Sequence, residues 1–156
     1  MPKTDYYDDP DAPRANSLVV AVAAVVRDES GRLLLIERTD NGLWAVPGGA
    51  QDIGETTREA VVREVREETG VEVEVTGIAG IYSDPRHVIA YDDGEVRQEF
   101  SIVFRARPVG GQLRPSAESR QAQWVTPDEI ERLAIEPSMR MRIQHGLDDR
   151  AMPYLS

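Results

Sequence analysis

Residues 48–71 read GGAQDIGETTREAVVREVREETGV, a glycine pair followed by a segment rich in glutamate and valine. From Glu55 or Thr56 to Thr69 the apolar residues recur at helical spacing, and Gly70 is typical of the end of a helix. At about 100° per residue, one side of this helix is expected to pack on a sheet. That side carries Val61, Val62, Val65 and Thr69.

Another face of the same helix carries a cluster of carboxylates. Glu64, Glu67 and Glu68 lie at positions i, i+3 and i+4, together with Ala60, and Arg63 is expected outside this cluster. Like charges at i,i+4 cost about 0.2–0.5 kcal/mol per pair. A bound cation therefore explains the three carboxylates better than a solvated charged face does. Mg²⁺ suits them, because it is a hard ion that takes oxygen ligands.

The glycine pair precedes the helix and is typical of a backbone that turns sharply. Gly48 and Gly49 carry no Cβ, so the chain can approach a ligand closely, and a peptide carbonyl there could join a metal shell. Gly54 and Glu55 then start the helix, where N-terminal amides favour anions. An ordinary tight turn stays open as the alternative for the glycine pair.

The spacing of these residues resembles a known family motif. Gly49, five residues, Glu55, seven residues and then residues 63–71 match the Nudix box, GX5EX7REUXEEXGU, where U is a bulky aliphatic residue. All seven fixed identities are present, and both U positions are valine. If each identity occurs about once in fifteen positions, a chance match in this chain is expected at roughly 10⁻⁶. The flanking sequences LWAVPGG and WVTPDEI are also similar to this family.

The resemblance implies the Nudix fold, an α+β fold in which an α/β/α sandwich surrounds a mixed sheet. It also implies Mg²⁺-dependent hydrolysis of a phosphoanhydride bond in a nucleoside diphosphate linked to another moiety, with Mn²⁺ as a substitute metal. By resemblance, the metal ligands would be Glu64, Glu67 and Glu68, assisted by the carbonyl of Gly48.

The resemblance assigns further roles near the box. Glu55 and Arg63 would pair and hold the loop against the helix. The catalytic base would be a box glutamate, with Glu67 preferred, or an acid on a later loop. Glu118, six residues before Trp124, is the nearest acid outside the box, and an ordinary surface glutamate is its alternative reading.

One proline bears on the substrate. Pro85 is the fifteenth residue after Gly70, close to the spacing at which the ADP-ribose subgroup of the family carries a proline. This favours ADP-ribose or a nucleotide sugar. Tyr82, Arg86 and Arg97 are candidates for contacting such a substrate, with packing or surface positions as the alternative.

Two other functions stay open. One is a sanitising (d)NTP pyrophosphatase, which would use the same metals and the same helix. The other is a non-catalytic module that binds a nucleotide metabolite. Such modules often lose glutamates of the box, whereas this chain keeps Glu64, Glu67 and Glu68.

The rest of the chain predicts strands with few helices. Residues 1–16 are expected to form an extended arm, and residues 17–156 the Nudix domain. His87 is expected in a loop, His145 on the surface of a helix and Trp44 in the core. The expected elements are a hairpin of strands at 17–28 and 32–38, a strand at 71–84, a loop at 85–94, a strand at 95–108, a strand and short helix at 120–133, and a helix at 137–149.

Composition limits the environment and the partners. The chain has 156 residues, no cysteine and a formal charge of -10, so one domain without disulfides or thiol chemistry is expected. Such an acidic surface repels nucleic acids and anionic membranes, and a cation would have to mediate binding of a small nucleotide. The N-terminus lacks the features of a signal peptide, so a cytoplasmic protein is expected. Because many Nudix enzymes are homodimers, the arm could exchange between two copies.

Overall fold

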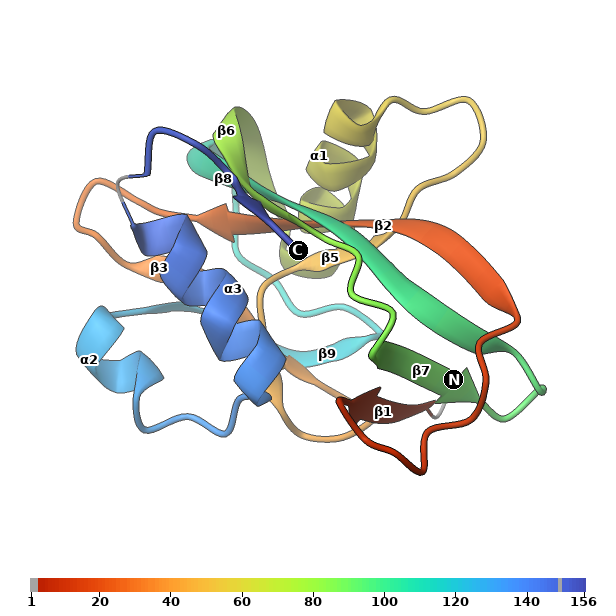
Figure 1. Cartoon of the computed structure of the whole chain (residues 1–156). Helices are drawn as coiled ribbons and strands as arrows, with labels where there is room; N and C mark the ends of the chain where they lie inside the picture. The colour runs from red at the N-terminus through yellow and green to blue at the C-terminus, as the bar shows by residue number, and fades with distance from the viewer. Residues whose placement is uncertain (1–2, 149) are drawn as a thin grey trace.

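The computed structural model describes residues 3–148 and 150–156, and it confirms an α+β fold with a mixed sheet (Figure 1). The strands are β1 (Lys3–Tyr7), β2 (Ser17–Val26), β3 (Leu33–Arg38), β4 (Trp44–Ala45), β5 (Gly48–Ala50), β6 (Val71–Tyr82), β7 (His87–Tyr91), β8 (Val96–Gly111), β9 (Ser119–Val125) and β10 (Tyr154–Leu155). The helices are α1 (Thr57–Thr69), α2 (Pro127–Ile130) and α3 (Pro137–Leu147).

The long strand β8 organises the larger sheet. It pairs in parallel with β2 along one edge, and β2 pairs antiparallel with β5. Along its other edge β8 pairs antiparallel with β7 and then with β6. β1 extends the sheet beyond β7, and β10 pairs in parallel with β6. β5, which carries the glycine pair, is therefore an edge strand beside the central β2.

The alternation of side chains along β2 explains why the larger sheet is covered by a helix on each face. Val22, Ala24 and Val26 pack in the core cluster that includes the apolar side of α1. Ala23 and Val25 pack in the opposite cluster, together with residues of α3. Successive residues of a strand point to opposite faces, so a strand that is apolar throughout must be covered on both faces. The two helices accordingly lie on opposite sides of β2 and β8 (Figure 1).

The predicted hairpin of residues 17–28 and 32–38 is wrong. A turn at Asp28 and Gly31 is present, but beyond a single bridge between Arg27 and Leu33 the two strands separate. β3 instead lies in the middle of a second, three-stranded sheet, between β4 and β9. The physical reason is that β2 and β3 are both apolar on both faces, so each occupies the centre of its own sheet.

The loop predicted at residues 85–94 contains a strand, so that prediction is also wrong. His87 to Tyr91 form β7, which makes a hairpin with β8 around Gly94. β1 covers the other edge of β7 in a five-residue antiparallel register from Lys3 to Tyr7. The N-terminal segment is thus extended along the domain's own sheet, and His87 is buried.

Capping boxes begin two of the helices. Thr56 and Glu59 form a capping box at α1, and Thr126 and Glu129 form another at α2. The prediction of a surface position for His145 is wrong, because this residue of α3 is buried and its Nδ1 lies 2.7 Å from the hydroxyl of Tyr82. Trp44 is buried in the core, as expected.

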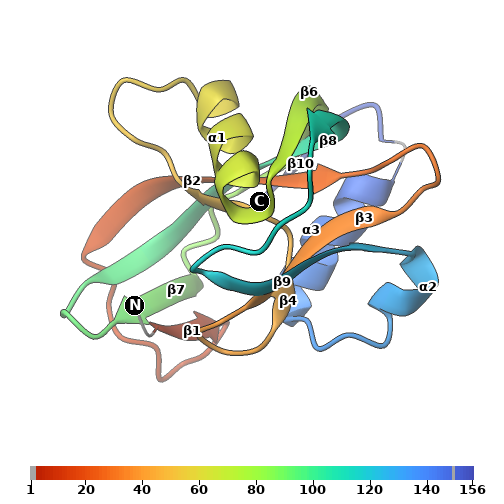
Figure 2. The same ribbon diagram turned by 180° about the vertical axis from the view of Figure 1, so that it is seen from behind.

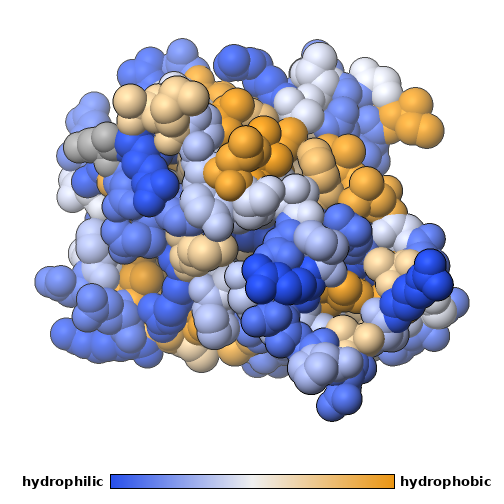
Figure 3. All heavy atoms as spheres, in the orientation of Figure 1, coloured by the Kyte–Doolittle hydropathy of each residue, from blue (hydrophilic) through white to orange (hydrophobic). Residues whose placement is uncertain are grey.

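The surface is mainly polar. Figure 3 shows hydrophilic side chains over most of the face seen in Figure 1, with apolar ones gathered mainly in its upper half. Figure 2 shows the opposite side, where β9 lies beside β3 and α1 stands above. Among the described residues, no helix has the length and apolar character needed to cross a membrane.

Candidate active site

The caps of α1 determine where its carboxylates project. The hydroxyl of Thr56 accepts the amide of Glu59 at 3.1 Å, and the Glu59 carboxylate accepts the amide of Thr56 at 3.3 Å. At the other end Gly70 has a φ of 80°, which is the left-handed conformation that ends a helix. Local hydrogen bonds at both ends therefore define where α1 begins and ends.

Glu68 is the most deeply placed of the carboxylates, with only 4% of its surface exposed. Its Oε1 accepts the amide N–H of Gly48 at 3.3 Å, and among the described residues it forms no ion pair. Burial, reinforced by the negative charge of Glu64, raises the pKa of Glu68 to about 8. A buried carboxyl of this kind needs a cation beside it to be fully ionised at neutral pH.

The other two glutamates lie progressively closer to solvent. The side chain of Glu64 is 13% exposed and that of Glu67 is 57% exposed. Burial raises the pKa of Glu64 above its ordinary value, although Arg63 opposes this effect. Ala60, expected beside the carboxylates, is fully buried with Val61, so the acidic face directly borders the face that packs on the sheet.

Arg63 lies inside the acidic cluster, so the prediction that it would lie outside is wrong. Its guanidinium donates two hydrogen bonds to Glu55, at 2.6 and 2.9 Å, which is the pairing that the family resemblance implies. It also donates to Glu64 at 2.9 Å, to Glu67 at 3.2 Å and to the carbonyl of Ala50 at 3.1 Å. Because an arginine has five N–H donors, this one side chain can bind carboxylates of α1 and groups of the preceding loop at the same time.

The glycine loop is pressed against this cluster. β5 pairs with β2 so that Gly49 lies opposite Val22. A Cβ atom on Gly49 would lie only 2.5 Å from the carboxylate carbon of Glu64. A Cβ on Gly48 would collide with the carbonyl of Val22 and with Ala23. Both glycines are therefore required by close packing between loop, strand and helix, and this goes beyond an ordinary tight turn.

The donor set fits a hard divalent cation. The groups that line this place are carboxylate and peptide oxygens, which are the ligands that Mg²⁺ and Mn²⁺ prefer. In the arrangement described, no three acidic or histidine side chains of residues 3–148 and 150–156 form a ready coordination shell. Arg63 holds Glu64 and Glu67, and the amide of Gly48 holds Glu68. Glu68, which forms no ion pair among the described residues, is the carboxyl whose ionised form a bound cation would stabilise.

The turn at residues 116–119, where β9 begins, lies against the C-terminal part of α1 that carries Glu68. The hydroxyl of Ser119 donates to the carbonyl of Glu68 at 3.3 Å, and the amide of Thr39 donates to the carbonyl of Glu118 at 3.2 Å. The negative charge of Glu118 contributes to the raised pKa of both Glu68 and Glu64. The structure thus brings Glu118 near the helix carboxylates from a segment about fifty residues farther along the chain.

Sequence reasoning missed a cation in this region. Arg38 ends β3 and pairs with Asp40 through two hydrogen bonds of 2.9 and 2.8 Å. These bonds raise the pKa of Arg38, and the charges of Glu68 and Glu118 raise it further. The available signal was the charged pair of Glu37 and Arg38, which directly follows four buried apolar residues and marks the point where β3 leaves the core.

Three candidate substrate residues lie away from the carboxylates. Arg86 is exposed and pairs with Asp84. Tyr82 is buried beneath α3, and Arg97 pairs with Glu95 and lies over a tyrosine ring. Among the described residues, no hydrogen bond or ion pair joins Tyr82, Arg86 or Arg97 to the glutamates of α1.

Comparisons with known proteins bear on the family and on the fold. The family model described as the NUDIX domain matches residues 17–145. A protein named MutT-like protein from Streptomyces ambofaciens is 44% identical over 78% of this chain and 73% of its own length. A protein named ADP-ribose pyrophosphatase from Methanocaldococcus jannaschii is 37% identical over 75% of this chain and 67% of its own length. The crystal structure of a MutT protein from Methanosarcina mazei Go1 superposes with a TM-score of 0.64 at 27% identity, covering 88% of this chain and 96% of that one.

Proposed function

This chain belongs to the Nudix hydrolase family, and we propose that it uses Mg²⁺ to hydrolyse a phosphoanhydride bond in a nucleoside diphosphate linked to another moiety. The observation that carries the proposal is the buried, uncompensated carboxyl of Glu68, which lies beside Glu64 and 3.3 Å from the amide of Gly48. Burying an acid in this way is unfavourable unless a cation completes the site.

In this proposal Glu64, Glu67 and Glu68 bind the metal, and the carbonyl of Gly48 assists. The bound metal would neutralise charge on the phosphoryl oxygens and make a water molecule more acidic. Mn²⁺ would substitute for Mg²⁺, since both ions take oxygen ligands. The rigid caps of α1 and the close packing of Gly49 on Glu64 hold these side chains in position before any ligand arrives.

Arg63 and Glu55 are positioning residues in this scheme. Their paired hydrogen bonds tie the loop to α1, and Arg63 also orients Glu64. Glu67 is the preferred base, because its side chain is 57% exposed and Arg63, at 3.2 Å, is its one ion-pair partner among the described residues. It is therefore free to accept a proton from an attacking water. Glu118 is the alternative base from the turn before β9.

For the substrate we favour ADP-ribose or a related nucleotide sugar. The support is the position of Pro85 relative to Gly70 and the name of the Methanocaldococcus jannaschii relative, ADP-ribose pyrophosphatase. The helix site by itself serves a nucleoside triphosphate equally well, because both substrates present a phosphoanhydride to the same carboxylates. The leaving group is therefore the property to measure.

The test is a substrate panel with product identification. The protein would be incubated with Mg²⁺ and ADP-ribose, other nucleotide sugars, dinucleotides or (d)NTPs, and the products separated by chromatography. We expect one class to be cleaved, with EDTA abolishing turnover. Glu68→Gln should lower kcat by at least about 100-fold, while Glu29→Gln, an exposed change in a distant turn, should keep the wild-type rate.

The products distinguish the alternatives. A mononucleotide plus a sugar phosphate would support the favoured substrate class, and a mononucleotide plus pyrophosphate would identify a triphosphate pyrophosphatase. Wild-type rates in Glu68→Gln would show that the chemistry lies elsewhere. Tight nucleotide binding without turnover of any substrate, with Mg²⁺ or Mn²⁺, would identify a binding module.

A further inference from the structure

A hollow with a volume of about 210 Å³ lies where α3 ends, on the face of the larger sheet opposite α1. Residues of β2, β6 and β8 form its floor, and the last residues of α3 form one wall. Gly146 of α3 packs tightly on the sheet, since a Cβ there would lie 2.5 Å from Cγ2 of Val25. The hollow therefore opens at the point where the helix leaves the sheet.

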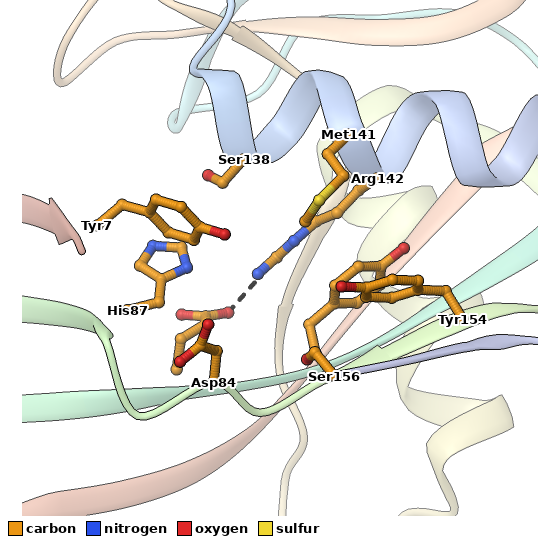
Figure 4. Close-up of a pocket in the computed structure, with 10 residues that line it drawn as sticks. Tyr7, Asp84, His87, Ser138, Met141, Arg142, Tyr154 and Ser156 are labelled. Carbon is orange, nitrogen blue, oxygen red and sulfur yellow. Dashed lines mark ion pairs between the residues drawn. The ribbon is translucent and has the colours of Figure 1, made fainter.

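A second hollow, beside the N-terminal half of α3, is too small to hold a ligand. It lies among Ser138, Arg142 and Tyr154 and has a volume of about 20 Å³ (Figure 4). This is room for about one water molecule. Its buried charges also balance each other, because Arg142 lies 3.6 Å from the carboxylate of Glu99. The hollow at the C-terminal end of α3 is much larger, and its charges are not balanced in this way.

Three arginines, Arg27, Arg105 and Arg107, line the floor of the larger hollow. Val25 of β2 pairs with Arg105 of β8. The amide of Arg27 donates to the carbonyl of Ala106 at 3.0 Å, so Arg27 lies beside Arg107. Residues two apart on a strand point to the same face, and Val25 faces the core beneath α3. The three arginine side chains therefore leave neighbouring positions on one face of the sheet.

The positive charge of these arginines is only partly compensated. Arg105 donates hydrogen bonds to four backbone carbonyls, which carry no net charge, and three of them lie at the end of α3. Arg107 pairs with Glu74 at 2.6 Å. Arg27 forms no ion pair among residues 3–148 and 150–156. Like charges on neighbouring strands repel each other, so this arrangement is unfavourable unless an anion joins it.

Two aspartates also line the hollow, but each has a partner outside its floor. Asp28 accepts a hydrogen bond from Nε of Arg32 at 2.9 Å. Asp148 accepts one from the side-chain amide of Gln144 at 2.9 Å and lies 3.6 Å from Arg150. When the ion-pair partners are included, five arginines face three acids. The hollow is thus a positively charged place on a chain with a formal charge of -10.

A bulge in β6 adds a hydroxyl to this set of donors. Val75 and Gly77 pair with consecutive residues of β8, so Thr76 between them has no partner across the sheet. Bulges redirect a side chain and are frequent beside functional sites. Thr76 lines the hollow, and its hydroxyl forms no hydrogen bond among the described residues. Free guanidinium N–H groups and a hydroxyl therefore converge on the same space.

We propose that this hollow binds a small phosphoryl anion, held by Arg27, Arg107 and the hydroxyl of Thr76. Guanidinium groups bind phosphate through paired N–H donors. A phosphoryl group presents three or more oxygens to three donor side chains, whereas a carboxylate presents two. Pockets that enclose a drug-sized ligand begin at about 300 Å³. The anion is therefore inorganic phosphate or pyrophosphate, or the phosphate end of a larger molecule that stays in solvent.

This anion site is separate from the carboxylates of α1. It lies on the other face of the sheet, beside the end of β2, whereas the glycine loop pairs with β2 at Ala21 to Ala23. No residue of the hollow belongs to the proposed metal site. The inference therefore stands or falls independently of the proposed hydrolysis.

Metal-free protein provides the test, because without a metal the carboxylate cluster repels anions. The protein would be freed of metal on a chelating resin and titrated calorimetrically with phosphate, pyrophosphate and ADP. We expect pyrophosphate to bind, and Arg27→Gln and Arg107→Gln each to weaken its binding by at least about fivefold. Arg132→Gln removes the same charge from an exposed position outside the hollow and should bind like the wild type.

The ligands distinguish the sources of the phosphoryl group. Binding of pyrophosphate and ADP with similar affinity would support a site that accepts the phosphates of a nucleotide, and binding of the inorganic anions alone would support a site for those anions. Arg27 and Arg107 are both exposed, so neither change is expected to lower the melting temperature. If Arg107→Gln does so through the loss of its pair with Glu74, Arg27→Gln remains the informative variant.

Two results would overturn the anion site. One is the failure of all three ligands to bind metal-free wild-type protein. The other is an equal loss of affinity in Arg27→Gln and Arg132→Gln, which would show general attraction by charge. Hydrolysis measured with Mg²⁺ in the absence of added anion should be the same in Arg27→Gln and the wild type, because Arg27 lies outside the carboxylate cluster.

Discussion

A Cβ atom on Gly49 would lie 2.5 Å from the Glu64 carboxylate carbon, and a few ångströms away Glu68 is buried without an ion pair among the described residues. These two residues show how the site is held at the scale of single side chains. Gly49 leaves room for a carboxylate, and Glu68 keeps a carboxyl where only a neutral or metal-bound form is stable. Predictions at this scale concern the size of the side chain at position 49 and the charge of Glu68.

Gly49→Ala should inactivate the enzyme without unfolding it. The added methyl group has to displace the carboxylate of Glu64, and a misplacement of about 1 Å in such a site lowers the rate by roughly 100-fold. kcat/KM measured on the best substrate of the panel checks this. Gly77→Ala is the matched control, because a Cβ on Gly77 meets no atom within 4 Å and its φ is not positive. Equal activity in both variants would contradict the close packing of loop and helix.

Glu68 should make the stability of the metal-free protein depend on pH. Its pKa is about 8 in the folded chain, against 4.5 for an ordinary glutamate. The protonated carboxyl therefore contributes stability that is fully present below about pH 4.5 and is lost as the pH rises through about 8. Urea unfolding in EDTA between pH 5 and 9 should show the wild type losing stability relative to Glu68→Gln. A difference that does not vary with pH would rule out a protonated, buried Glu68.

At the scale of elements, α1 is a helix whose two ends are defined locally and whose middle is defined by packing. The capping box at Thr56 and the left-handed Gly70 bracket the helix, and Val61 and Val65 attach it to the sheet. The glycine strand β5 and the turn before β9 then approach α1 from two directions. The site therefore needs an exact register of α1 against β2 and β9.

Removal of the cap should weaken the helix in a measurable way. Thr56→Ala loses the hydrogen bond to the amide of Glu59, so the free energy of unfolding should fall by about 1 kcal/mol. Thr126→Ala removes the equivalent cap from α2 and is the matched comparison for stability. Only Thr56→Ala should also lower Mg²⁺ affinity, since only α1 carries the carboxylates. Equal effects of both variants on metal binding would mean that the register of α1 does not depend on its cap.

At the scale of the whole molecule, the chain has a formal charge of -10, which repels the phosphate-bearing ligand that we propose as its substrate. In the proposed function a cation at the carboxylate cluster would resolve this conflict locally, and the acidic surface would repel nucleic acids. The N-terminal segment extends the larger sheet by one strand. In it β1 pairs with the edge of β7, and the carboxylate of Asp5 lies 2.7 Å from the ring of His87. A segment of this kind could also pair with a second copy of the chain.

Deletion of residues 1–8 distinguishes these two arrangements. Because β1 pairs with β7 of its own chain, we expect the molecular mass measured by light scattering to stay the same, whether the protein is a monomer or a homodimer. The melting temperature should fall, since five paired residues and the contact between Asp5 and His87 are lost. A change in mass on deletion would show that β1 is exchanged between copies.

The sequence alone determined those features that depend on neighbours a few residues apart. The helix of residues 57–69 follows from side-chain periodicity and the turn at Gly31 from short-range hydrogen bonds, so both could be predicted. The family resemblance also implied the pairing of Glu55 with Arg63, eight residues apart on a loop and the helix that follows it.

Only the tertiary structure decided which strands pair and which distant side chains meet. β2 and β3 are equally apolar, and nothing local says that they belong to different sheets. The short strand β7 is stabilised by pairing with β8 and β1. His145 is buried next to Tyr82, sixty-three residues earlier, and the two side chains share a hydrogen bond. Arg142 and Glu99 likewise meet only when α3 covers β8. Such contacts depend on the packing of whole elements, whose free energy is shared among many residues, so no short stretch of sequence encodes them.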